Sequence, residues 1–180
     1  MAVLVSLGII IGTLLIGDII RNWLLKRDSQ SLLTKLIFDA ILTIELCTAA
    51  LEFGVIFQHF GIYWWTAGLF MNSVYQSTRW VGLTPPAPYV HLLEWIEGKQ
   101  TFFELILRVS TLMTVGLLTY NFYVSKLWDY GLSDLHLRRS FETSLNSCQT
   151  PWAVVPFSYA FGAEFIGTAF LVSQNHPATI

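Results

Sequence analysis

Five apolar runs, each long enough to cross a bilayer as a helix, dominate this sequence. A spanning helix needs about 20 mostly apolar residues at about 1.5 Å rise per residue. The chain is 54% hydrophobic but only 12% charged over 180 residues, which is about half the charge of a typical soluble domain. One soluble core cannot hide this much apolar surface, so we predict an all-α membrane protein. The expected spans are residues 2–25, 36–60, 62–81, 102–127 and 152–172.

The first run has no basic region before it and no small-residue cleavage pattern after it, which favours an uncleaved anchor over a signal peptide. A net charge of −2 with scattered cations gives no basic footprint for nucleic acid, so nucleic-acid binding is excluded. Cys47 lies in an apolar run and Cys148 in a polar segment, so the pair indicates no disulfide and no redox compartment. We expect no metal and no cofactor.

Two segments between the runs are too short or too polar to span. Residues 82–89 contain three prolines and predict a turn, after which Val90 to Glu97 predicts a short helix with Pro88 suited to its first position and Gly98 as its stop. This half-length helix is either interfacial or re-entrant, and its spacing alone favours the interfacial interpretation. The polar stretch from residue 129 to 150 predicts an ordinary solvated loop.

Basic residues near the ends of the runs predict the orientation. The first connection is rich in Lys and Arg, which places it in the cytoplasm and the N-terminus on the opposite side. The turn near residues 59–62 and the loop at 129–150 are then non-cytoplasmic, whereas the proline-rich half-helix and the C-terminus are cytoplasmic. The basic residues of that first connection are Arg21, Lys26, Arg27 and Lys35.

Four acids at membrane depth are the most informative residues. Each costs about 2.5–3.5 kcal/mol at the centre of a spanning helix, so they should face protein or water. Glu45 and Glu52 are seven residues apart and lie nearly on one helical face, whereas Asp39 is rotated away from them. Glu164 is the acid of the last run. Structural hydrogen bonding is favoured over the alternative, a proton or ion path.

Two of these acids share a local pattern with a threonine. Asp39 and Thr43, like Glu164 and Thr168, are four residues apart and so lie on one helical face. The two helices run in opposite senses in the predicted orientation, which indicates an inverted repeat of the kind that many transporters and channels contain.

This order of elements resembles the aquaporin family, and within it the unorthodox superaquaporin branch, the eleven and twelve subgroup. The shared order is an acid-x-x-x-Thr helix, a second helix, a Pro-containing turn into a cytoplasmic half-helix, a third helix and another acid-x-x-x-Thr helix. The local motifs that are similar are Leu127-Trp128, Gly131-Leu132-Ser133-Asp134-Leu135-His136 with Arg139-Ser140-Phe141, and Glu45-Leu46-Cys47 ahead of Leu51-Glu52-Phe53.

The resemblance implies an aquaporin-like first half with an extra N-terminal helix and the first helix of an inverted second half. In this division residues 1–27 are the extra transmembrane helix, 36–127 the first half with a re-entrant half-helix at 88–97, 128–150 a non-cytoplasmic loop, 151–173 the opening helix of the second half, and 174–180 a tail. The second half-helix of the family has no counterpart in the chain, so we expect a fragment or a short form of a channel.

By position, the family's Asn-Pro-Ala signature falls on Ala87-Pro88-Tyr89. Ala87 lacks the amide that the family's asparagine offers to water in the pore. The resemblance therefore implies a channel for water and small neutral solutes such as glycerol. It also implies a homo-oligomer, by family a tetramer, in a lipid bilayer, with an intracellular membrane such as the endoplasmic reticulum favoured and the plasma membrane as the alternative.

Two other functions compete with the channel. His91 and Glu94 place an imidazole and a carboxylate on one helical face, but without a catalytic pattern around them we predict that the protein is not an enzyme. A non-transporting scaffold or regulatory short form that binds full-length channel subunits is the second alternative. A belt of interfacial tryptophans, among them Trp95 and Trp128, suits either membrane function.

Overall fold

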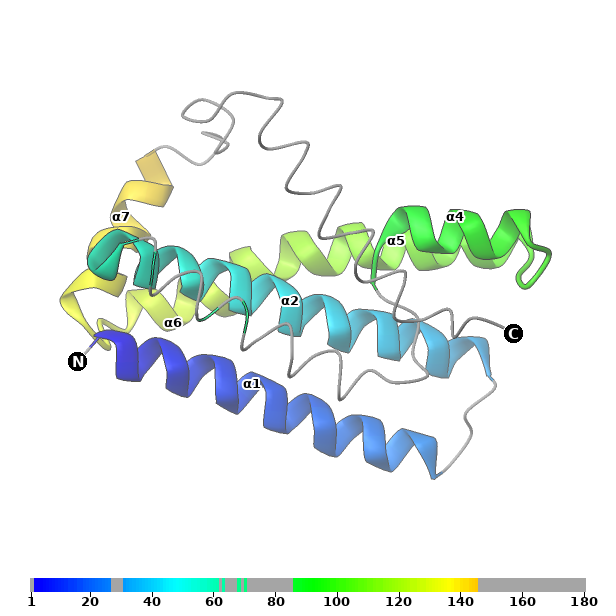
Figure 1. The fold of residues 1–180 in the computed structure, drawn as a ribbon, viewed down its shortest axis with the longest axis horizontal. Helices are drawn as coiled ribbons and strands as arrows, with labels where there is room; N and C mark the ends of the chain where they lie inside the picture. The colour runs from blue at the N-terminus through cyan, green and yellow to red at the C-terminus, as the bar shows by residue number, and fades with distance from the viewer. Residues whose placement is uncertain are drawn as a thin grey trace.

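The protein is a bundle of helices, and Figure 1 shows the long ones lying side by side. The structure, a computed structural model, describes residues 2–26, 31–61, 63, 68, 70 and 86–145. Within these residues the regular elements are all helical. They are α1 (Ala2–Leu25), α2 (Leu32–Phe60), α4 (Pro88–Ile96), α5 (Phe102–Leu118), the π-helix η1 (Thr119–Val124), α6 (Ser125–Asp129) and α7 (Asp134–Leu145).

The α1 helix packs against α2 and runs in the opposite direction (Figure 1). Its buried residues form one face: apart from the adjacent Thr13 and Leu14 they are three or four positions apart, as the 3.6-residue period requires. Its other face exposes large apolar side chains, including Leu4, Leu15 and Ile19. The buried residues are Ser6, Ile10, Thr13, Leu14, Gly17, Arg21 and Leu24.

The α5, η1 and α6 helices follow one another without a break from Phe102 to Asp129. A capping box starts this long helix, because the Thr101 hydroxyl accepts from the Glu104 N–H while the Glu104 carboxylate accepts from the Thr101 N–H. Gly131, with φ of 65°, follows its end. This helix and Ala2–Leu25 are the two, among the described residues, that are long and apolar enough to cross a membrane.

The expected spans at 2–25 and 102–127 are thus confirmed as long apolar helices. The expected span at 36–60 is also helical, and α2 begins four residues earlier than predicted. It carries four charged residues, three of which are the acids discussed below. The expected span at 62–81 lies outside the described residues except for the isolated positions 63, 68 and 70. The expected span at 152–172, with Glu164 and Thr168, and the tail at 174–180 lie wholly outside them.

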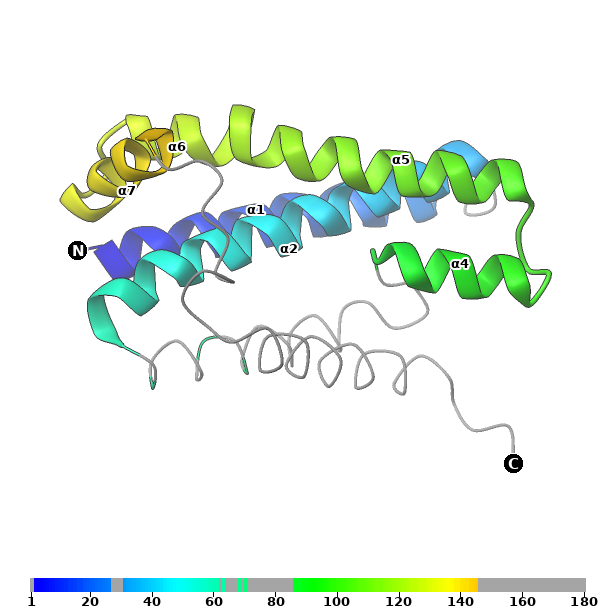
Figure 2. The same cartoon turned by 90° about the horizontal axis from the view of Figure 1, so that it is seen from above.

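The short helix α4 begins at Pro88, as the proline predicted, and ends at Ile96. Gly98 follows in the left-handed region with φ of 72°, which glycine adopts without strain. Figure 2 shows α4 running antiparallel alongside the N-terminal part of α5, with its Pro88 end toward the middle of the bundle. Its buried residue is His91.

The expectation of a loop over residues 129–150 is wrong for most of its length. Residues 134–145 form α7, which packs against α6 at one end of the bundle (Figure 2). Ser133 precedes this helix, and its hydroxyl accepts from the His136 N–H at 3.4 Å, which is the geometry of a helix N-cap. The segment folds as a helix because a polar sequence with a good cap needs only a narrow apolar face to dock.

Candidate functional site

The three acids of α2 are nearly inaccessible to solvent, and each meets partners on a different neighbouring element. Asp39, Glu45 and Glu52 are 1%, 2% and 0% exposed. Burial of an ionised carboxylate is tolerated only when hydrogen bonds or an opposite charge replace its lost hydration. The partners of each acid therefore define how the helices are held together.

Asp39 forms a two-pronged ion pair with Arg108 of α5. The Arg108 Nε donates to Asp39 Oδ2 at 2.7 Å and the Nη2 donates to Asp39 Oδ1 at 2.9 Å. Two parallel contacts of this kind match the planar guanidinium to the carboxylate and fix both side chains. The pair joins α2 to α5.

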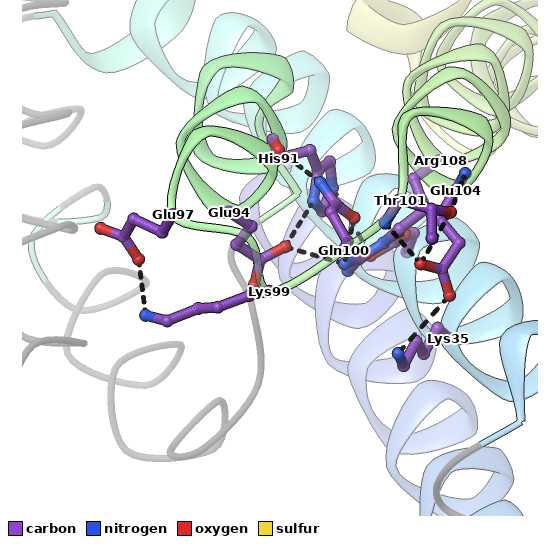
Figure 3. A network of polar contacts seen from close by, with 10 residues as sticks. Lys35, His91, Glu94, Glu97, Lys99, Gln100, Thr101, Glu104 and Arg108 are labelled. Atoms are coloured by element: carbon purple, nitrogen blue, oxygen red, sulfur yellow. Dashed lines mark hydrogen bonds and ion pairs between the residues drawn. The ribbon is translucent and has the colours of Figure 1, made fainter.

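The remaining end of the same guanidinium reaches α4 and the connection after it (Figure 3). Arg108 Nη1 donates to Glu94 Oε2 at 2.9 Å and to Gln100 Oε1 at 3.4 Å. The Gln100 amide in turn donates to the main-chain carbonyl oxygen of His91. A nine-residue helix is too short to be stable alone, so these polar contacts hold α4 in place. We call Asp39, His91, Glu94, Gln100 and Arg108 the Arg108 cluster.

His91 lies inside this cluster and is fully buried. Its Nδ1 lies 3.3 Å from Glu94 Oε2, and its Nε2 lies 3.8 Å from Asp39 Oδ1 without a hydrogen-bond partner. The expected proximity of His91 and Glu94 is thus confirmed, but the pair faces an arginine and a second carboxylate inside the bundle.

Glu45 faces α1, where it meets Arg21. Arg21 Nη1 donates to Glu45 Oε1 at 2.6 Å, and Arg21 Nη2 contacts Asp18 on its own helix. Gly17 lies directly beneath the Glu45 carboxylate, since a Cβ at Gly17 would overlap Glu45 Oε1 and approach its Cδ to 3.0 Å. A glycine here lets the carboxylate lie against the α1 backbone.

Glu52 faces the far end of the bundle, where α6 and α7 meet. Trp128 Nε1 donates to Glu52 Oε1 at 2.8 Å, and His136 Nε2 lies 3.0 Å from Glu52 Oε2. The hydroxyl oxygen Oγ of Ser6, on α1, lies 3.2 Å from the same His136 Nε2 atom. Trp128 and His136 are 1% and 0% exposed. The expectation that Trp128 belongs to an interfacial belt is therefore wrong, and His136, which lies in the stretch expected to be a solvated loop, is buried.

The acid-threonine spacing places Thr43 on the turn after Asp39, but the hydroxyl bonds the backbone. Thr43 Oγ1 donates to the Asp39 main-chain carbonyl oxygen at 2.6 Å, the usual bond of a threonine to the residue four positions earlier in a helix. The matching pair of Glu164 and Thr168 lies outside the described residues, so the inverted repeat stays a prediction.

Ala87, Pro88 and Tyr89 form the start of α4. Ala87 is extended, with φ of −133° and ψ of 129°, and makes no side-chain cap. Its carbonyl oxygen accepts from the Val90 N–H at 3.0 Å, so the chain turns directly into the helix. Ala87, the residue at the N-cap, therefore brings no side chain that would neutralise the positive end of α4.

The cations that pair with the acids were not predicted as site residues. Arg21 and Arg108 lie inside the predicted helical runs, and a search for opposite charges within those runs would have indicated them as partners. Outside the spanning segments, the hydrogen bond from Lys99 Nζ to Glu97 Oε2, at 2.6 Å, raises the pKa of that lysine. No group of three metal-ligating side chains occurs in the described ranges.

The chain was compared with protein-family models, with curated proteins and with solved structures, and none of them matches it.

Proposed function

We propose that this protein is a superaquaporin-like membrane channel for water and small neutral solutes such as glycerol. The observation that carries the proposal is the half-helix α4, whose N-terminus has no side-chain cap and which Arg108 holds beside α5. Two long apolar helices, α1 and the helix from Phe102 to Asp129, support its location in a membrane.

An uncapped helix N-terminus suits the conduction of neutral molecules. Pro88 has no N–H, and the Val90 N–H donates to the Ala87 carbonyl oxygen at 3.0 Å. The Tyr89 N–H is therefore the first main-chain donor of α4 for the oxygen of water or of an alcohol, and the positive end of the helix disfavours cations and protons. Ala87 brings no side-chain donor to this end, so the Tyr89 N–H would act without help from the residue before the helix. We propose slow passage with weaker selectivity than an asparagine at this position would give.

The pairing of the buried acids favours neutral solutes over ions. A path for cations or protons needs carboxylates that can release their partners as the ion passes. Asp39 is instead held by two contacts from Arg108, and Glu52 accepts from Trp128 at 2.8 Å. These acids stabilise helix packing in the proposal, and the solute passes elsewhere.

The proposal includes a setting that the resemblance implies. The chain would form the first half of the channel fold, with α4 as the re-entrant half-helix, and would assemble as a homo-oligomer, by family a tetramer. Its membrane would be intracellular, such as the endoplasmic reticulum, or else the plasma membrane.

Osmotic shrinkage of vesicles containing the chain tests the proposal, with stopped-flow light scattering as the readout. We expect water permeability above that of empty vesicles and a further change when Ala87→Asn adds a donor at the start of α4. Ala50→Asn is the matched control, because Ala50 is exposed on α2, and it should leave the permeability unchanged.

Two outcomes would count against the channel. Permeability equal to that of empty vesicles would reject conduction by this chain and favour the non-transporting scaffold that binds other channel subunits. Equal effects of Ala87→Asn and Ala50→Asn would reject the role of the α4 N-terminus.

A further inference from the structure

Ser133, His136 and Glu52 form a continuous chain of hydrogen-bonding groups at the end of the bundle where α2 meets α7. The Ser133 Oγ atom lies 2.5 Å from His136 Nδ1, and His136 Nε2 lies 3.0 Å from Glu52 Oε2. A hydroxyl, an imidazole and a carboxylate in this order activate a serine for acyl transfer on several unrelated folds. The arrangement therefore makes Ser133 a candidate nucleophile.

The neighbours of this chain of groups determine which imidazole nitrogen carries the hydrogen. Trp128 Nε1 donates to Glu52 Oε1 at 2.8 Å and so leaves Oε2 to face His136. An ionised carboxylate only accepts, which places the imidazole hydrogen on Nε2. The Ser6 hydroxyl, 3.2 Å from the same Nε2 atom, offers that hydrogen a second acceptor. Nδ1 then has a lone pair for the Ser133 O–H, which is the pattern that a nucleophilic serine needs.

Of the three residues, Ser133 is the accessible one. His136 and Glu52 are fully buried, whereas Ser133 is partly exposed. Ser133 directly precedes α7, whose first main-chain N–H groups, those of Asp134 and Leu135, have no partner within the helix. These N–H groups and the positive end of the helix can stabilise a negatively charged oxygen beside Ser133.

We propose that Ser133 is the nucleophile of an esterase site, with His136 as its base and Glu52 as the residue that orients the base. The Ser133 oxygen bonds to the carbonyl carbon of an ester, and its proton passes to His136 Nδ1 while the carbonyl oxygen becomes an oxyanion. The imidazolium gives this proton to the alcohol as the ester C–O bond breaks, which leaves the acyl group on Ser133. Water then attacks the acyl carbon through the same proton transfers, releasing the carboxylic acid and restoring the serine.

Exposed apolar side chains on the segment around the serine favour an apolar acyl group. Tyr130, Leu132 and Leu137 are 78%, 49% and 52% exposed. Apolar groups that are exposed together offer a surface for an apolar part of a ligand. The substrate class is therefore a carboxylic ester with an apolar acyl chain, such as a butyrate ester.

The esterase site is separate from the start of α4 and does not rest on the proposed channel. Glu52 and His136 are 84 residues apart in the sequence, so no local motif indicates the site. A reactive Ser133 would make the expectation that the protein is not an enzyme wrong, since that expectation considers only His91 and Glu94.

A fluorophosphonate reagent tests the serine directly, because an activated serine oxygen displaces the fluoride and keeps the phosphonyl group. The chain in detergent is incubated with the reagent, and peptide mass spectrometry locates the adduct. We expect the adduct on Ser133 and not on Ser125, whose hydroxyl donates to the Asn121 main-chain carbonyl oxygen. An unmodified Ser133 would overturn the proposal.

Hydrolysis of p-nitrophenyl butyrate gives a second readout. Ser133→Asn should abolish it without unfolding α7, because asparagine is as good an N-cap as serine and its amide can donate to His136 Nδ1. Ser125→Asn, the same exchange at a serine outside the site, should leave the rate unchanged. A rate in Ser133→Asn equal to that of the unmodified chain would reject the esterase.

Glu52→Gln tests the role of the carboxylate. Trp128 Nε1 can only donate, so it holds the oxygen of the new amide and turns the NH₂ group toward His136 Nε2. That contact moves the imidazole hydrogen to Nδ1, and the Ser133 O–H loses its acceptor. We expect labelling and hydrolysis to fall by about 10²–10⁴-fold.

Undiminished labelling of Ser133 in Glu52→Gln would reject the chain of three groups. If Glu52→Gln does not fold, His136→Gln takes its place with the same expected loss and the same contradicting outcome. Because these measurements do not use permeability, the esterase and the channel can fail independently.

Discussion

At the scale of single residues, Arg108 holds the polar contacts of the bundle together. Its guanidinium contacts Asp39 of α2, Glu94 of α4 and Gln100 of the connection that follows α4. No other side chain type presents donors in this planar fork, and a lysine offers only a compact point charge. The geometry of three segments therefore depends on one arginine.

We predict that Arg108→Met destabilises the protein by about 3–5 kcal/mol, the cost of leaving a buried partner such as Asp39 without its cation. Arg108→Lys keeps the charge but cannot make the two-pronged contact, so it should lower the free energy of unfolding by less than Arg108→Met does. The free energy of unfolding in detergent, measured with denaturant, checks both values. Arg138→Met is the control, because Arg138 is exposed on α7, and an equal loss in that variant would contradict the role of Arg108.

At the scale of elements, the approach of α1 to α2 depends on a small residue opposite a large one. A Cβ at Gly17 would displace the Glu45 carboxylate, whose Oε1 accepts from Arg21 at 2.6 Å. Gly12 on the same helix has open space, with nothing within 4 Å of a Cβ. The two glycines thus separate the effect of packing from that of helix propensity.

Gly17→Ala should destabilise the protein by about 0.5–2 kcal/mol. This is the loss of a charged hydrogen bond, about 1.5–3 kcal/mol, less the gain of up to about 1 kcal/mol from replacing glycine by alanine in a helix. Gly12→Ala should be neutral or stabilising for the same reason. Thermal unfolding of the two variants side by side makes the comparison, and similar changes in both would show that Glu45 does not need the space at Gly17.

The elements could be predicted from sequence wherever apolar runs or strong end signals mark them. Pro88 and Gly98 marked the start and stop of α4, and the apolar runs marked α1 and α5. The α7 helix was missed because its polar composition hides its helical period, although Ser133 before Asp134 is an N-cap signal. The partners of the acids were missed because pairing between helices depends on rotation about their axes, which a sequence does not contain.

At the scale of the whole molecule, the long helices divide the protein into two ends. One end of the bundle contains the N-terminus, the last turn of α2 and the corner between α6 and α7 (Figure 2). The opposite end contains the last turn of α1 and the connection between α4 and α5. Trp23 and Trp95, 57% and 39% exposed, lie on α1 and α4 near this second end, and amphipathic aromatic side chains are typical of a membrane interface. Charged clusters between the helices do not contradict a membrane setting, since their charges are directed inward.

If the long helices cross a membrane, the two ends must be accessible from opposite sides. Tyr130 is 78% exposed after α6, and the Lys99 side chain is 59% exposed between α4 and α5. The test uses a chain in which Cys47→Ser and Cys148→Ser remove the native thiols. A membrane-impermeant thiol reagent should label Tyr130→Cys from the non-cytoplasmic side and Lys99→Cys from the cytoplasmic side. This orientation is expected because basic residues gather at the end that carries Lys99. Lys26→Cys should follow Lys99→Cys. Labelling of both Tyr130→Cys and Lys99→Cys from one side would mean that the helix from Phe102 to Asp129 does not cross the bilayer. That result would contradict the proposed membrane channel.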